Sequence, residues 1–201
     1  MWYALIPAYG ASPVRIACLG DSITAGMLVR KEDCWVSRVA KALGKKAEVG
    51  NFGVSARCLL FKGDRPITRE KAYRDALAFK PGMLLIGLGT NDSKSFNWVH
   101  KADFIKDTQT MIDAFKALPS QPEIYLCYPS KAYLTGESIN DDIISKEIIP
   151  MIKKVAKKNK LPVIDLHSAM DGMPELFPDH IHPNEEGAKV MAKAVYDAIA
   201  K

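Results

Sequence analysis

The feature that most constrains the fold of this chain is a repeated alternation of short apolar runs with amphipathic segments. The clearest runs, 14–19 and 83–88, consist mostly of apolar residues with no apolar–polar alternation, which indicates strands buried on both faces of a sheet. Turn-forming residues bound several of the runs. The predicted strands are 14–19, 47–51, 83–88, 123–128 and 161–166.

Between these runs, apolar residues recur at the three- to four-residue spacing of helices with one buried face. In the first such segment Trp35, Val39 and Leu43 share a face, and Gly44 ends the helix. Pro150 either kinks the fourth helix or opens a second helical segment. Residues 129–140 are predicted to form a loop and are a candidate flap near the site. The predicted helices are 35–43, 73–80, 102–118, 140–158 and 184–200.

Strand and helix alternate about five times, an order that builds a parallel sheet with helices on both faces. Right-handed crossover connections then produce a three-layer α/β/α sandwich around a five-stranded parallel sheet. The 201 residues fit a single domain, 1–201, because no repeat, low-complexity tract or linker divides them. Sheets of this kind carry their ligand sites beyond the carboxyl ends of the strands.

The composition bears on the kinds of partner. The formal net charge is +5, and much of the excess is a lysine run, 153–160, spaced like the solvated end of a helix. No aromatic stacking motif accompanies it, so we expect no nucleic-acid partner. No apolar run approaches the length that spans a bilayer, so we expect no membrane partner. The cysteines and histidines lack metal-ligand spacing, and we expect no metal and no other cofactor.

The cellular compartment stays open at the level of sequence. Cys18 and Cys127 lie in predicted strands and are expected to be buried thiols, whereas Cys34 and Cys58 could pair in an oxidising compartment. The segment 1–13 lacks the basic start of a signal peptide, although small residues end its apolar stretch. It is either an ordinary segment of a cytoplasmic protein or the remnant of a trimmed export signal on a periplasmic or secreted one.

Ser22 is the candidate nucleophile. It follows Gly20 and Asp21 where the first strand ends, in a turn beyond the edge of the sheet. A nucleophilic serine needs a base and a group that orients the base. An acid three residues before a histidine can share one side of a turn, so Asp179 is expected to orient His182 as that base. The alternative is an ordinary surface turn before the last helix.

Two further loops are expected to supply donors for the oxyanion of acyl transfer. Gly53 follows the second strand, and its lack of a side chain lets its N–H approach a substrate closely. Asn91 follows the third strand and offers a side-chain amide that donates without a change of charge. Each is also a common loop residue, so each gains weight only in combination with Ser22.

Together these segments resemble the four sequence blocks of the SGNH hydrolases, the GDSL-type esterases and lipases. The blocks occur in order along nearly the whole chain: Gly20-Asp21-Ser22, Gly53 in an Asn-Phe-Gly-Val-Ser setting, Gly89-Thr90-Asn91-Asp92, and Asp179-x-x-His182-Pro183. The first block continues with Ile23 where the family name implies leucine, a conservative change. The resemblance implies a flavodoxin-like sandwich and a serine esterase that needs no metal or cofactor.

The resemblance also implies a role for each matching residue. Ser22 is expected to be the nucleophile and a backbone oxyanion donor. His182 is expected to act as general base and then as acid, with Asp179 orienting it. The Gly53 N–H and the Asn91 amide complete the expected oxyanion hole.

The predicted substrate is a small acyl ester, above all an O-acetyl ester on a carbohydrate. The segment 91–98 is similar to the family branch that includes sialate and acetylxylan esterases. Asp21 is expected to contact the substrate, and Trp98 is expected either to line an acyl or sugar pocket or to pack in the core. The alternatives are a lysophospholipase or thioesterase of the same family, or a carbohydrate-binding module without catalysis.

Overall fold

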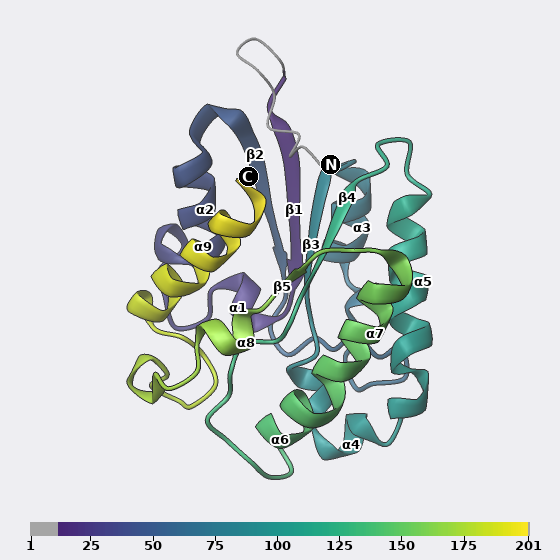
Figure 1. The fold of residues 1–201 in the computed structure, drawn as a ribbon, viewed down its shortest axis with the longest axis vertical. Coiled ribbons are helices and arrows are strands. Elements are labelled where there is room, and N and C mark those ends of the chain that lie inside the picture. Colours follow the sequence, from purple (N-terminus) through teal and green to yellow (C-terminus); the bar gives the residue numbers. More distant parts are fainter. Residues whose placement is uncertain (1–11, 201) are drawn as a thin grey trace.

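The computed structural model describes residues 12–200 and contains a five-stranded sheet whose neighbouring strands are all parallel (Figure 1). The strand order is β2-β1-β3-β4-β5. The strands are β1 (Val14–Gly20), β2 (Ala47–Gly53), β3 (Met83–Gly87), β4 (Glu123–Cys127) and β5 (Val163–Ile164). Every strand expected from the sequence is present, although β5 is shorter than the predicted 161–166.

Helices cover both faces of this sheet, which confirms the predicted three-layer α/β/α sandwich (Figure 1). On one face lie α2 (Trp35–Leu43) and α9 (Glu185–Ile199), which contact each other. On the other face lie α3 (Lys71–Ala78), α5 (Phe104–Lys116) and α7 (Ile149–Asn159). The short helices are α1 (Ser22–Ala25), α4 (Ser95–Trp98), α6 (Asp141–Ile143) and α8 (Leu166–Ala169).

Each face of the sheet buries its own apolar cluster. Ala17 and Leu19 of β1 belong to the cluster that includes α5 and α7, whereas Ile16 and Cys18 belong to the cluster that includes α2 and α9. Successive side chains of a strand point to opposite faces, so both sets must be apolar when helices cover both faces. This requirement explains why the sequence of β1 lacks an apolar–polar alternation.

The helix predicted over 140–158 is interrupted. Asn140 caps α6 by accepting hydrogen bonds from the backbone N–H groups of Asp142 and Ile143. A π-helical turn, Ile144–Ile148, then leads into α7. Pro150 lies in the first turn of α7, directly after the π-helical turn, and the backbone of Ile148 and Ile149 before it is already helical. Of the two alternatives for Pro150, the structure therefore has the one in which it opens a second helical segment.

All four cysteines are buried free thiols, so the pairing of Cys34 with Cys58 is not formed. Within residues 12–200, no helix is both long enough and apolar enough to cross a bilayer. Most of the N-terminal segment, on which the export-signal alternative depends, lies outside the described residues.

Candidate active site

The loops of the predicted site leave the same edge of the sheet. Gly20, the last residue of β1, is in register with Gly53 at the end of β2 and with Gly87 at the end of β3. Because these parallel strands end together, the residues that follow them meet beyond one edge. The sheet register thereby brings the turn of Ser22 next to the turn of Asn91.

Ser22 opens α1, a short helix that folds back over the end of β1. The carboxylate of Asp21 caps this helix by accepting a hydrogen bond from Ile23 N at 2.9 Å. Gly20 permits the close approach, since a Cβ at that position would lie 2.1 Å from Thr24 Oγ1. Ser22 is consequently held in a fixed and largely buried place, with 6% of its surface exposed.

The structure brings Ser22, His182 and Asp179 together. Ser22 Oγ lies 2.8 Å from His182 Nε2, although the two residues are 160 positions apart in sequence. His182 Nδ1 lies 2.6 Å from Asp179 Oδ2. The other oxygen, Asp179 Oδ1, accepts hydrogen bonds from the backbone N–H groups of Ile181 and His182 at 3.0 and 2.7 Å. These backbone bonds form the turn that places the acid and the histidine on one side.

The partners of the imidazole assign its proton. Burial raises the pKa of Asp179, but hydrogen bonds from His182 and from Ile181 N outweigh this effect and hold that pKa below its usual range. The ionised carboxylate only accepts hydrogen bonds, so the hydrogen of the His182 ring is on Nδ1. Nε2 is then free to accept the hydrogen of Ser22 Oγ. In this arrangement the imidazole can take the serine proton.

The candidate flap, residues 129–140, forms hydrogen bonds with the turn 179–182 that contains the catalytic histidine candidate and with the segment before it. Tyr133 N donates to the backbone carbonyl of His180 at 2.7 Å. The Tyr133 hydroxyl donates to Met170 O at 2.8 Å and accepts from Met173 N at 2.7 Å. These bonds link the flap to residues 170–173 and to His180, all of which precede His182 in the chain.

Asn91 is buried in the turn after β3, with 5% of its surface exposed. Its amide nitrogen donates to Asp21 Oδ2 at 3.4 Å. Its backbone carbonyl accepts a hydrogen bond from Asn97 Nδ2 at 2.9 Å. Asn97 also accepts from Asp64 N, which ties a further loop to this turn. The sequence analysis includes Asn97 in the segment 91–98 but does not predict these hydrogen bonds, which join Asn97 to residues in other turns.

The structure gives the Gly53 N–H a different partner from the predicted oxyanion. This N–H donates to Asn51 Oδ1 at 2.9 Å, and Asn51 Nδ2 donates to the carbonyl of Thr24 at 2.8 Å. A Cβ on Gly53 would lie 2.2 Å from the backbone nitrogen of Ala25. The glycine therefore lets the end of β2 pack directly against α1. Asn51, which sequence reasoning missed, links β2 to the helix that carries Ser22.

Two non-glycine residues near the site adopt a left-handed backbone. Ala56, in the loop after β2, and His180, beside the histidine turn, each have a φ of 66°. Such conformations are uncommon outside glycine and concentrate at functional sites. Among residues 12–200, the N–H of Ala56 has no hydrogen-bond acceptor. It is a free donor three residues beyond Gly53.

Both residues predicted to contact the substrate are buried. Trp98 is 6% exposed, packs edge-on against Phe104 with ring centroids 5.5 Å apart, and donates through Nε1 to Glu147 at 3.1 Å. These contacts favour the core alternative for Trp98. Asp21 is 1% exposed, and each of its carboxylate oxygens accepts a hydrogen bond from the protein. Its carboxylate is therefore directed inward.

Asp21 and Asp92 are two buried carboxylates beside the site. Burial raises the pKa of Asp21 to about 6 and the pKa of Asp92 to about 7. The backbone N–H groups of Leu59 and Leu60 donate to Asp92 and lower its pKa, but the effect of burial is larger. In the part of the chain that the structure describes, no group of three His, Cys, Asp or Glu residues is arranged to hold a metal ion.

We expect the free energy of unfolding to be larger at about pH 5 than at about pH 7.5. Above about pH 4 the unfolded chain releases the protons of both carboxyl groups, whereas the folded chain keeps them until about pH 6 and 7. Stability therefore falls as the pH rises through this window. Urea denaturation at the two pH values measures the difference, and Asp92→Asn should reduce it. Greater stability at the higher pH would contradict the raised pKa values.

Residues 18–190, most of the chain, match the model of the GDSL-like lipase/acylhydrolase family. The chain belongs to this family. An acetylxylan esterase of Xylanibacter ruminicola is 42% identical, and the alignment covers 98% of this chain and 45% of that protein. This member of the GDSL-like family thus spans less than half the length of its curated relative.

Solved structures share the fold. The lipase/acylhydrolase from Enterococcus faecalis is 25% identical and superposes with a TM-score of 0.76 over 92% of this chain and 95% of that one. A carbohydrate acetylesterase family member from Sinorhizobium meliloti is 19% identical, with a TM-score of 0.72 over 94% and 100% of the two chains. The family match confirms the resemblance inferred from the four sequence blocks, and the superpositions confirm the predicted fold.

Proposed function

We propose that this GDSL-family chain is a serine esterase that hydrolyses small acyl esters, above all O-acetyl esters on a carbohydrate. The observation that carries the proposal is the 2.8 Å contact between Ser22 Oγ and His182 Nε2, with Asp179 on the other ring nitrogen. Family membership supports ester hydrolysis as the reaction. The similarity to an acetylxylan esterase supports an acetylated sugar as the substrate.

In the first half of the reaction, His182 Nε2 takes the proton of Ser22 Oγ while Oγ attacks the ester carbonyl carbon. The carbonyl oxygen becomes a tetrahedral oxyanion. Asp179 holds the imidazolium in position and stabilises its charge. The imidazolium then gives its proton to the alcohol oxygen as the ester C–O bond breaks, and the acyl group remains on Ser22.

In the second half, a water molecule takes the place of the alcohol. His182 accepts a proton from the water as its oxygen attacks the acyl carbon. The bond to Ser22 Oγ then breaks, and Oγ regains its proton from the imidazolium. One water is consumed and one carboxylic acid is released, with every proton passing through the same ring nitrogen.

Three donors are proposed for the oxyanion. The first donor is the N–H of Ser22, which is the first residue of α1 and therefore has no intrahelical acceptor for its N–H. The second donor is the side-chain amide of Asn91 in the adjacent turn. The third donor belongs to the loop after β2. Because the Gly53 N–H already donates to Asn51, we assign this role to the free N–H of Ala56.

Substrate assays with covalent labelling test this proposal. We expect faster release of p-nitrophenol from the acetyl than from the octanoyl ester, and release of acetate from acetylated xylan. An organophosphonate should add its mass to the peptide that contains Ser22. Preference for the octanoyl ester would support a lysophospholipase or thioesterase instead. Failure of Ser22 to be labelled, together with no hydrolysis, would support a binding module.

A crystal structure of the phosphonylated protein tests the third donor. The phosphonyl oxygen occupies the place of the oxyanion, and we expect it within hydrogen-bond distance of the N–H of Ala56. A contact with the N–H of Gly53, released from Asn51, would contradict this assignment and restore the sequence-based one.

A further inference from the structure

The strongest unassigned feature at the site is the buried carboxylate behind the nucleophile. We propose that Asp21 is a positioning residue that fixes the side-chain amide of Asn91 with its nitrogen toward the oxyanion. This inference rests on the proposed esterase function, because it gives Asp21 a role only if Asn91 stabilises an oxyanion.

The contacts of Asp21 connect the nucleophile turn with the oxyanion amide. Oδ1 accepts a hydrogen bond from Ile23 N at 2.9 Å, and Oδ2 accepts one from Asn91 Nδ2 at 3.4 Å. With 1% of its surface exposed, Asp21 lies under the site rather than in it. The Asp21 side chain therefore holds in position both α1, which carries Ser22, and the side-chain amide of Asn91.

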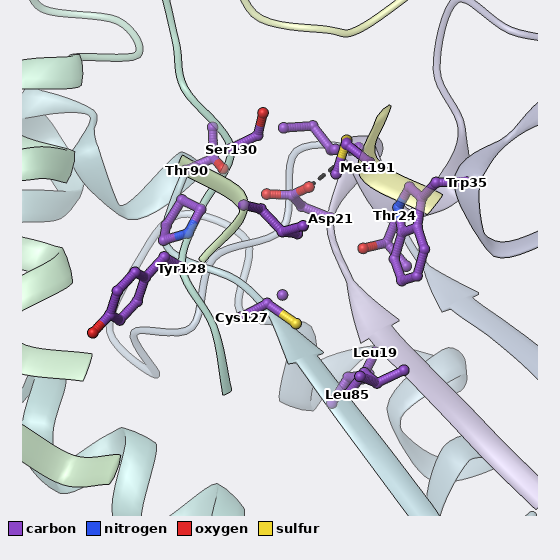
Figure 2. Close-up of a pocket in the computed structure, with 14 residues that line it drawn as sticks. Leu19, Asp21, Thr24, Trp35, Leu85, Thr90, Cys127, Tyr128, Ser130 and Met191 are labelled. Atoms are coloured by element: carbon purple, nitrogen blue, oxygen red, sulfur yellow. Dashed lines mark hydrogen bonds between the residues drawn. The ribbon is translucent and has the colours of Figure 1, made fainter. Parts of the chain in front are cut away.

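No substrate group reaches Asp21 from the interior side. Asp21 lines a cavity of about 20 Å³ together with Thr24, Thr90 and Ser130 (Figure 2). A cavity of this size holds about one water molecule, which is too small for an acyl or sugar group. The geometry therefore fits a group that acts through Asn91 and not one that binds the substrate.

An amide needs such a partner because its two ends are nearly the same shape and opposite in function. Only the nitrogen end donates, while the oxygen end would repel an oxyanion. The Asn97 contact holds the backbone of Asn91 but leaves the side-chain amide free to reverse. A carboxylate accepts and does not donate, so it selects the orientation with Nδ2 toward Asp21. The second hydrogen of that nitrogen is then available to the oxyanion.

The charge state of Asp21 provides an independent readout. His182 and Asp92 are the charged groups that act on Asp21 from neighbouring segments, and burial raises the Asp21 pKa to about 6. Below that pH, the protonated carboxyl group has a hydrogen to donate and no longer selects the nitrogen end of Asn91. We therefore expect Asp21 to add an acid-side loss of kcat to the one that protonation of the general base produces, and this added loss should be absent when Asp21 cannot ionise.

Asp21→Asn is the discriminating variant. Asparagine remains a good helix N-cap, so its oxygen can keep the bond to Ile23 N and its nitrogen then faces position 91. Asn91 must turn its oxygen to that nitrogen, which places the wrong end toward the oxyanion. We expect kcat for p-nitrophenyl acetate to fall about 10²-fold, approaching the loss of one oxyanion donor, with KM and the melting temperature little changed.

A double-mutant cycle with Asn91→Ala separates positioning from general structural damage. We expect Asp21→Asn to change kcat by less than about threefold when Asn91 is already alanine. Equal losses in both backgrounds would overturn the positioning role. Asp165→Asn is the matched control, because Asp165 caps the equally short helix α8 without contacting the site residues, and it should retain wild-type kcat.

Two further measurements test the proposal even if Asp21→Asn folds poorly. Asp21→Ser keeps an N-cap oxygen but offers nothing to Asn91, and it should also lower kcat. On the acid side, kcat of the wild-type protein should fall more steeply with falling pH than kcat of Asp21→Ser, in which only the general base remains to be protonated. Labelling of Ser22 with retained kcat in both Asp21 variants would overturn the positioning role and leave the esterase intact. Absence of Ser22 labelling in the wild-type protein would overturn the esterase itself.

Discussion

Replacement of Ser22 by alanine is expected to lower kcat/KM for p-nitrophenyl acetate by at least about 10⁴-fold. The variant loses the atom that forms the covalent bond, while it keeps the backbone N–H of residue 22 as an oxyanion donor. The helix α1 should persist, because alanine favours helices and the Asp21 cap does not involve the serine side chain. Steady-state hydrolysis and the melting temperature of the variant measure the two effects separately.

Two comparisons test whether this loss of activity is specific to Ser22 and whether Ser22 acts together with His182. Ser37→Ala is the control, because Ser37 lies on α2 and its hydroxyl bonds to Lys31 O, away from the reaction. The double variant Ser22→Ala with His182→Ala should be no slower than Ser22→Ala alone, since the base has no function without its nucleophile. Retention of more than about 1% of the activity by Ser22→Ala would contradict the assignment of the nucleophile.

The fold could be predicted from sequence because its signals are local. The apolar runs of β1 and β3 and the helical spacing of α2 each occupy a few consecutive residues, and their order along the chain specifies a parallel sheet. The pairing of Asp179 with His182 could be predicted for the same reason, since a three-residue spacing within one turn decides whether the two side chains face each other.

The remaining parts of the site depend on how separate segments approach each other. The packing of Gly53 against Ala25 follows from the distance between β2 and α1, which no local pattern encodes. Trp98 is ambiguous for a similar reason. A tryptophan on a short helix has the same sequence signature in a pocket wall and in the core, and only its contact with Phe104 distinguishes them.

Asp21 illustrates how a residue can belong to a motif and act differently from what the motif suggests. Its position next to Ser22 indicates a contact with substrate, yet the cap that holds Ser22 requires its carboxylate to turn back toward Ile23 N. Once turned inward, the carboxylate reaches Asn91 from the next strand. The N-terminus of α1 needs a hydrogen-bond acceptor, and this requirement determines where the Asp21 carboxylate lies.

Replacement of Asn91 by alanine is expected to lower kcat about 10²- to 10³-fold with little change in KM. The amide meets full negative charge only when the carbonyl oxygen becomes an oxyanion, so its loss raises the barrier more than it weakens substrate binding. Measurements of kcat and KM with p-nitrophenyl acetate test this, and Asn159→Ala is the control. Asn159 also bonds through its side-chain amide, to Gln109, but on the far helices α7 and α5.

Asn91→Asp sharpens the same test, because it keeps the shape of the side chain and removes its ability to donate. An ionised carboxylate beside Asp21 and the oxyanion would repel both, so this variant should lose at least as much kcat as Asn91→Ala. A variant pair that raises KM and leaves kcat unchanged would place Asn91 in ground-state binding and remove it from the oxyanion hole. In that case the donors that remain would be the backbone N–H groups, which no side-chain substitution can delete.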